Sequence, residues 1–185
     1  MKLGKALYFG DFVAIPLAIV GLAAWAMPGR GLLGPPEWLA SFAAGLFAWT
    51  FVEYIVHRWV FHAVPYFEKL HDAHHEEPLA LIGTPSFASS GLILAGFFLA
   101  PLAFTGALFA SGFASGALTG YAGYMAVHHA VHHMQPRPGS LLYRARLRHM
   151  AHHYHGAHGN YGVTTGLWDA LFGTVVEARR RAARA

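Results

Sequence analysis

The sequence predicts an all-α integral membrane protein with four transmembrane helices in two hairpins and a cytoplasmic helical cap that holds a dimetal polyhistidine site. Hydrophobic residues make up 55% of the 185 residues and charged residues only 12%. Globular proteins average about 25% charged residues, so this chain has too little charge to cover a soluble surface. Its apolar residues fall in four long runs, and all 14 histidines lie in two polar stretches, residues 57–75 and 128–158.

Length and composition limit the classes of protein that remain. We expect one domain, residues 1–185, because the chain is too short for two. The absence of cysteine excludes disulfides, iron–sulfur clusters and thiolate zinc sites. The net charge of +4 could indicate binding to nucleic acid, but the basic residues lie at the ends of apolar runs and near the C-terminus. That placement favours contact with anionic lipid headgroups, and we expect no nucleic-acid partner.

The first predicted hairpin joins apolar runs at residues 7–27 and 38–56. About 20 residues at about 1.5 Å each cross a hydrocarbon core of about 30 Å. The first run is longer than the 7–15 residues of a typical signal-peptide core, so we interpret it as a membrane helix. A Pro- and Gly-rich segment, residues 28–36, breaks the helix between the two runs, and Trp38 is placed as an interfacial anchor.

The second predicted hairpin joins residues 87–104 and 107–127 through a turn near Thr105 and Gly106. A turn this short returns the chain to the same side of the membrane. The two histidine-rich segments, residues 57–86 and 128–175, should therefore form one cap. Of the 13 Lys and Arg residues, only Arg30 falls on the opposite side, so the positive-inside rule makes the cap cytoplasmic.

Ten histidines in the cap have the spacing of metal ligands. They form four groups: His57 and His62; His71, His74 and His75; His128 and His132; His149, His152 and His153. Residues three or four apart share a helix face, so each group of three can close on one metal. The five-residue step of the first group suits a helix end. Ten ligands exceed a single coordination shell of about four to six, so two adjacent metal ions are predicted.

Glu53 lies near the end of the second apolar run, where a charge is costly unless it is paired or functional. Two interpretations remain open. The carboxylate could pair with Arg58, or it could accept the ring N–H of His57, four residues further along the same helix face, and orient that ring behind the metal.

Four histidines are not assigned to the metal site. His129 and His133 form an alternative pair, shifted by one residue from His128 and His132. His155 and His158 lie in a Gly-rich segment, where a solvated loop is favoured over ligation. Whether any of these four binds metal remains open from the sequence.

Four motifs resemble the fatty acid hydroxylase superfamily, the membrane di-iron group that includes sterol desaturases and sterol methyl oxidases. They are Glu53-Tyr-Ile-Val-His-Arg-Trp-Val-Phe-His62, His71-Asp-Ala-His-His75, Gly123-Tyr-Met-Ala-Val-His128 and Tyr161-Gly-Val-Thr-Thr-Gly-Leu-Trp-Asp-Ala-Leu-Phe-Gly173. Within this group, Leu141-Leu-Tyr143 and Leu167-Trp-Asp169 are most similar to the fatty acid 2-hydroxylases.

The resemblance implies a ligand set, a reaction and partners. The family's metal ligands fall on the same ten histidines, which would hold two iron ions, with zinc as the replacement metal in a purified sample. The expected reaction is hydroxylation of a fatty acyl chain of a lipid, favoured at the 2-position, by dioxygen and external electrons. Some members carry a haem domain, and nothing before Leu7 resembles one, so the expected electron donor is a separate protein of the cytochrome b or ferredoxin type.

The same residues leave alternatives open. A desaturase or a sterol- or carotenoid-type oxidase of the same superfamily would use the same ligands, and a non-catalytic metal-binding membrane protein would need no substrate. The sequence contains no Ser/His/Asp triad, phosphate-binding loop or dinucleotide fingerprint that would support another reaction.

Overall fold

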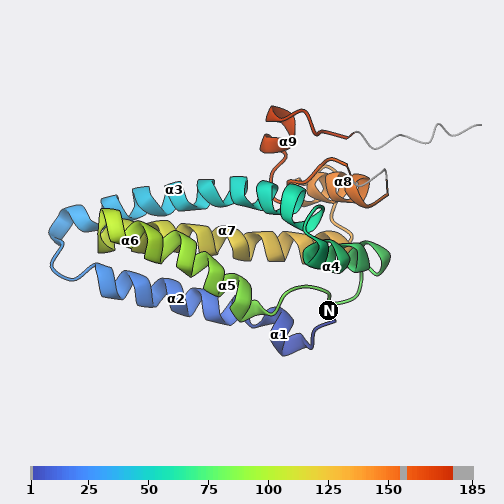
Figure 1. Cartoon of the computed structure of the whole chain (residues 1–185). Helices are drawn as coiled ribbons and strands as arrows, with labels where there is room; N and C mark the ends of the chain where they lie inside the picture. Colours follow the sequence, from blue (N-terminus) through green and yellow to red (C-terminus); the bar gives the residue numbers. More distant parts are fainter. Residues whose placement is uncertain (1, 155–157, 177–185) are drawn as a thin grey trace, which may run out of the picture.

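The computed structural model describes residues 2–154 and 158–176, and within these the regular elements are helices (Figure 1). The elements are α1 (Lys5–Phe9), α2 (Asp11–Ala26), the 3₁₀ turn η1 (Gly31–Leu33), α3 (Gly34–Ile55), the π-helical turn η2 (Val56–Phe61), α4 (Pro65–Glu76), α5 (Ser86–Leu94), the π-helical turn η3 (Ala95–Leu99), α6 (Ala100–Thr105), α7 (Ala107–His133), α8 (Leu141–Tyr154) and α9 (Leu167–Leu171). The all-α prediction is confirmed for this part of the chain.

A bundle of long helices forms the body of the molecule. Figure 1 shows α2, α3, α7 and the α5–η3–α6 rod lying side by side, with α4, α8 and α9 gathered at one end. The rod turns sharply into α7 at Gly106, whose φ of 94° is a backbone conformation that favours glycine. The second hairpin is thus formed at the predicted turn, and the two histidine-rich segments meet at one end of the bundle.

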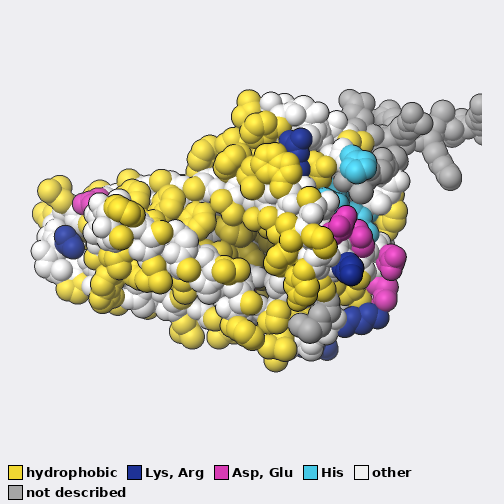
Figure 2. All heavy atoms as spheres, in the orientation of Figure 1, with side chains coloured by type: hydrophobic (Ala, Val, Ile, Leu, Met, Phe, Trp, Pro, Cys, Tyr) yellow, Lys and Arg dark blue, Asp and Glu magenta, His cyan; other side chains and the backbone are white. Residues whose placement is uncertain are grey.

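Three helical stretches among the described residues are long and apolar enough to cross a membrane: Lys5–Ala26, Gly31–Phe61 and Phe87–Thr105. They match three of the four predicted runs. Their outer side chains are apolar and exposed, as at Val20, which is 67% exposed. In Figure 2 hydrophobic side chains cover most of this face of the bundle, and charged side chains concentrate at the end that carries the histidines. These features are those of a membrane protein.

The fourth predicted run forms α7, which is the central helix of the bundle, and many of its residues are buried. Small residues let α3 approach it closely. A Cβ added at Gly45 would overlap the Phe113 carbonyl group, and one at Gly116 would overlap the Phe42 carbonyl group. Backbones in such close contact gain dispersion energy that lipid tails cannot supply. This packing fixes where the ends of α3 and α7 deliver their histidines.

The N-terminal segment is tied to the loop between α4 and α5. The Leu3 backbone N–H donates to the Leu81 carbonyl oxygen at 2.8 Å, and Lys2 pairs with Glu77 at 2.7 Å. Lys2 also forms an isolated antiparallel bridge with Ile82. The loop is therefore held against the start of the bundle, next to the histidine-bearing end.

Candidate metal centre

Eight of the ten predicted ligands form two groups of four, in each of which one side-chain nitrogen per residue lies within 4.8 Å of the others. The first tetrad is His57, His62, His71 and His152, and the second tetrad is His74, His132, His149 and His153. Each tetrad combines residues from three parts of the chain, so neither can exist before the bundle folds.

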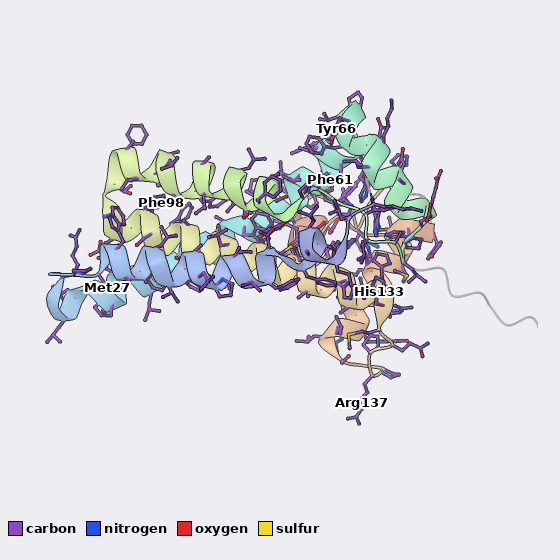
Figure 3. All side chains as sticks on the ribbon, turned by 90° about the horizontal axis from the view of Figure 1, so that it is seen from below. Met27, Phe61, Tyr66, Phe98, His133 and Arg137 are labelled. Atoms are coloured by element: carbon purple, nitrogen blue, oxygen red, sulfur yellow. The ribbon has the colours of Figure 1, made fainter. Side chains whose placement is uncertain are left out.

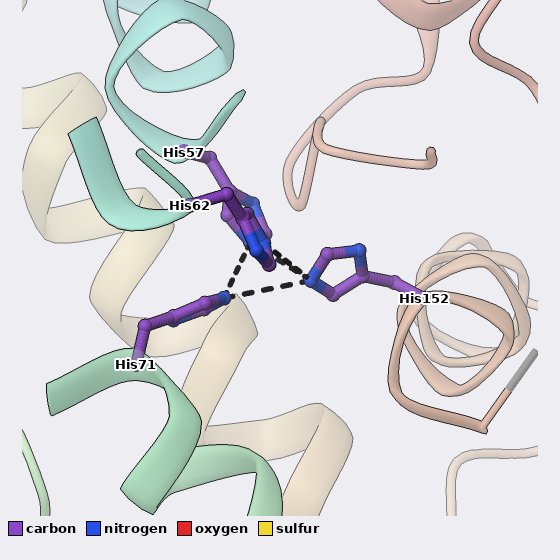
Figure 4. Close-up of side chains that lie close together, drawn as sticks. All are labelled: His57, His62, His71 and His152. Carbon is purple, nitrogen blue, oxygen red and sulfur yellow. Dashed lines mark hydrogen bonds between the residues drawn. The ribbon is translucent and has the colours of Figure 1, made fainter. Parts of the chain in front are cut away.

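The first tetrad is drawn in Figure 4. The Nε2 atom of His57 lies 3.0 Å from Nε2 of both His71 and His152, and Nε2 of His62 lies 3.3 Å from Nε2 of His152. Metal–nitrogen bonds of about 2.0–2.1 Å would separate neighbouring ligand nitrogens by about 3.0–3.4 Å. The observed spacing therefore suits a metal ion between these rings.

The π-helical turn η2 explains the five-residue step from His57 to His62. In a π turn each hydrogen bond spans five residues, so positions five apart come to the same side. The sequence suggested only a helix end here. Because α3 widens into this turn, both rings face the point where α4 and α8 supply His71 and His152.

The second tetrad has the same close spacing. His132 Nε2 lies 3.1 Å from His74 Nε2 and 2.8 Å from His149 Nε2, and His153 Nε2 lies 3.1 Å from His149 Nε2. The residues come from α4, α7 and α8. The observed separations again fit ligands of a single ion.

Each predicted group of three histidines is divided between the two tetrads, although its spacing would also allow it to close on one metal. Helix α4 gives His71 to the first tetrad and His74 to the second, and α8 gives His152 to the first and His149 to the second. Residues three apart are displaced by about 4.5 Å along a helix axis. A helix lying across both tetrads therefore serves two centres.

The remaining two predicted ligands, His75 and His128, lie next to the tetrads. His75 Nε2 is 3.0 Å from His71 Nε2, and its ring stacks on that of His153 with centroids 4.1 Å apart, so His75 lies between the tetrads. The ring of His128 lies 4.6 Å from that of His74, beside the second tetrad. All ten predicted side chains are thus brought together.

The other histidines lie outside both tetrads or outside the described residues. His129 and His133 stack on each other with ring centroids 4.2 Å apart, and the Tyr8 hydroxyl lies 3.5 Å from His129 Nδ1. His133 and His158 are exposed. His155 lies outside the described residues.

Backbone carbonyl groups of the loop between α8 and α9 orient two rings of the first tetrad, those of His57 and His152. His57 Nδ1 lies 2.6 Å from the Tyr161 carbonyl oxygen, and His152 Nδ1 lies 2.8 Å from the Gly159 carbonyl oxygen. A carbonyl oxygen can only accept, so each Nδ1 carries the proton and each Nε2 lone pair is directed at the tetrad. This is the arrangement that fixes a metal-binding tautomer.

Glu53 holds that loop, which is neither of the two roles considered for it. Its Oε1 atom accepts the backbone N–H groups of Val163 at 2.7 Å and Thr164 at 2.8 Å, and Oε2 accepts the Thr164 hydroxyl at 2.6 Å. Arg58 instead donates to the Tyr54 hydroxyl at 2.7 Å. Glu53 therefore acts on His57 through the loop and not by contact with its ring.

Asp169 is a second buried clamp, and the sequence reasoning did not identify it. Its carboxylate accepts the backbone N–H groups of Tyr161 at 2.9 Å and Gly162 at 2.8 Å, and the Thr174 hydroxyl at 2.7 Å. The available signal was a lone carboxylate in an apolar run, which is costly to bury unless it is fully hydrogen-bonded.

The electrostatics favour neutral imidazoles. Burial, with a smaller contribution from nearby His75, lowers the pKa of His62 and of His74 to about 4. Burial also lowers the pKa of His152 to about 3, against the opposing effect of its hydrogen bond to Gly159. Neutral imidazole is the form that binds metal. The cluster is therefore ready to ligate at neutral pH and repels added protons.

An apolar cavity of about 130 Å³ borders the tetrads. Its walls are largely aromatic and come from α1, α2, η2, α4, α7 and residues 82–84. Figure 3 shows Phe61, one of these wall residues, where the bundle meets α4. At the histidine end the cavity is lined by His71 of the first tetrad, His74 of the second, and His128. An alkyl chain in this space would lie directly beside both candidate metal positions.

Together, the fold and the site define a class: apolar helical-bundle proteins with a histidine-rich centre suited to two metal ions and open to an apolar cavity. The fatty acid hydroxylase family model matches residues 42–174. The chain belongs to the fatty acid hydroxylase family, which confirms the expectation drawn from its motifs.

Individual relatives support the same family assignment. The chain is 32% identical to fatty acid 2-hydroxylase of Mus musculus over 155 residues, which cover 75% of this chain and 40% of that protein. It is 29% identical to dihydroceramide fatty acyl 2-hydroxylase FAH1 of Arabidopsis thaliana over 174 residues, covering 88% and 72%. A solved structure, full-length scs7p with only the hydroxylase domain visible, superposes with a TM-score of 0.78 at 26% identity, covering 97% of this chain and 69% of that one. The chain spans about 40% of the length of the mammalian relatives it matches.

Proposed function

We propose that this protein is a membrane-bound di-iron oxygenase that hydroxylates a fatty acyl chain of a lipid, at the 2-position, with dioxygen and electrons from a separate donor. One observation carries the proposal: two histidine tetrads lie side by side, and an apolar cavity is lined by His71 and His74, one from each. The relatives are named fatty acid and fatty acyl 2-hydroxylases, which supports this choice of substrate and position.

Each tetrad would hold one iron ion, with His75 and His128 completing the set of ten ligands. Imidazole nitrogen suits iron and also zinc, which competes for such sites. When bound, the two ions would supply the oxygen chemistry that protein side chains cannot perform. The residues themselves orient the ligand rings, as Tyr161 and Gly159 do for His57 and His152, and their burial favours the neutral form of the ligand imidazoles.

The cavity walls would position the substrate. Aromatic side chains such as Phe61 and Phe67 exclude water and bind methylene groups, each worth about 0.8 kcal/mol when buried. Since His71, His74 and His128 border the cavity, a C–H bond placed there would lie next to both ions. Holding reactants in contact accounts for much of an enzyme's rate enhancement.

The topology proposed with this function has four membrane spans, with α7 as the enclosed fourth, and a cap in the cytoplasm. The basic residues on the histidine-bearing side support that orientation. A cytoplasmic cap would receive electrons from a soluble or membrane-tethered carrier of the cytochrome b or ferredoxin type. In this proposal the whole chain, residues 1–185, forms a single membrane domain of the fatty acid hydroxylase type.

Reconstitution tests the proposal. The protein, loaded with ferrous iron without oxygen and placed in lipid vesicles with a chemical reductant, should consume dioxygen and yield a lipid heavier by one oxygen atom. His152→Ala should abolish turnover, whereas His133→Ala, an exposed histidine outside both tetrads, should retain it. A product lighter by two hydrogen atoms would identify a desaturase. Metal binding without oxygen consumption would identify a metal store.

A further inference from the structure

Helix α9 and the residues after it expose apolar side chains at the charged end of the molecule. Leu171 is 67% exposed, Val175 56%, Leu167 48% and Phe172 46%. The one charged residue of this helix, Asp169, is fully buried and holds the loop before it. The outward face of residues 167–175 therefore carries no charge, which is unusual for a helix facing water.

Helix α9 packs against a membrane-length stretch of the chain. The Trp168 ring packs against Phe51 with centroids 4.7 Å apart and against Phe47 at 5.8 Å, and its Nε1–H donates to the Thr50 hydroxyl at 3.0 Å. All three partners belong to α3, inside the apolar stretch Gly31–Phe61. Figure 1 shows α9 lying beside α3, near the end of the bundle that carries α4 and α8.

We propose that residues 167–175 form a membrane-interface anchor that seats this part of the cap in the bilayer. The occupant of the surface is lipid, because the exposed face continues that of α3, where Phe47 is 57% exposed among other apolar side chains. A tryptophan at the boundary between apolar and charged surface is typical of the membrane interface. The predicted cap thus has a part that is not in water.

The anchor is connected to the metal centre. Asp169 of α9 holds Tyr161 and Gly162, and the Tyr161 carbonyl oxygen orients His57. Seating α9 in the bilayer would restrain the loop, residues 159–166, that directs His57 and His152 at the first tetrad. This link from the anchor to the metal centre rests on the proposed function, whereas the membrane contact itself does not.

Site-directed spin labelling tests the contact, and the cysteine-free chain gives it no background. A nitroxide would be attached to Leu171→Cys in phosphatidylcholine vesicles and its relaxation measured with oxygen and with a water-soluble nickel complex. Val20→Cys on α2 is the lipid control and the exposed, charged position Arg144→Cys on α8 is the water control. The Leu171 label should respond several-fold more to oxygen than to nickel, as the Val20 label does.

Two results would overturn the contact. A Leu171 label that behaves like the Arg144 label faces water. A label shielded from both reagents and broadened by a second nitroxide lies between two copies of the chain. Neither result depends on metal or turnover, so failure here is distinguishable from failure of the proposed function.

A matched pair of charge substitutions tests the connection to the loop. Leu171→Glu should raise amide hydrogen exchange in residues 159–166 by several-fold in vesicles, because a charge at the anchor opposes its burial in lipid. Leu147→Glu, at a position 45% exposed on α8, should leave that exchange unchanged. Equal exchange in the two variants would show that the anchor does not restrain the loop.

Discussion

Replacing Glu53 by Gln tests whether Glu53 controls the orientation of the His57 ring through the loop between α8 and α9. The carboxylate of Glu53 accepts three hydrogen bonds, from two backbone N–H groups and the Thr164 hydroxyl. A glutamine amide keeps one acceptor oxygen, and the hydroxyl can rotate to accept from its NH₂ group. The loss is mainly the charge assistance, since hydrogen bonds to charged groups are worth about 1.5–3 kcal/mol and neutral ones about 0.5–1.5 kcal/mol.

We therefore expect Glu53→Gln to fold, with a less stable loop, and to retain both metal ions with weaker binding at the first tetrad. Groups behind a ligand ring typically alter metal affinity by about 10–100-fold. Chelator competition, read by elemental analysis, measures this affinity. Glu37→Gln, the same change at an exposed position in the first turn of α3, is the control. Unchanged affinity in Glu53→Gln would refute the role of the loop, and complete loss of an ion would make Glu53 a ligand.

Three further predictions concern the tetrads and the bundle. His152→Ala should reduce bound iron from two ions toward one per chain, because in the proposed centre each tetrad holds its own ion. Loss of both ions would show one shared site. Metal content should stay constant from about pH 8 to 5 and fall as the pH approaches 4. The reason is that the pKa of His62 and of His74 is about 4, and only neutral imidazole binds metal. Release of metal near pH 6.5, the ordinary histidine pKa, would contradict burial of the cluster. Gly116→Leu should prevent stable folding, because its side chain would enter the Phe42 backbone, whereas Gly91→Leu, at an open position, should fold normally.

Much of this architecture follows from the sequence because its signals are local. Apolar runs of bilayer length predicted the long helices, and the turn at Gly106 lies between α6 and α7 as expected. The close packing of α3 on α7 also has a local basis, because small residues such as Gly116 lie where the two helices meet. Histidine spacing was enough to predict that ten side chains would meet at one end of the bundle.

The details of the centre depend on long-range contacts that spacing cannot reveal. Spacing along one helix would allow His71, His74 and His75 to close on one metal, but the orientation of α4 across both tetrads divides them. The π turn that aligns His57 with His62 leaves no simple residue pattern. The partners of Glu53, Val163 and Thr164, lie more than 100 residues away in sequence, so the nearby Arg58 and His57 were the only partners that helix periodicity could propose.

The central claim, that two adjacent sites each bind one metal ion, is tested most directly by loading the wild-type protein with ferrous iron in the absence of oxygen. Iron content and X-ray absorption should be measured on the same sample. The proposed function predicts two iron ions per chain, each with a nitrogen-dominated shell and a second iron nearby. A single ion per chain, or isolated ions with no second iron in range, would contradict it.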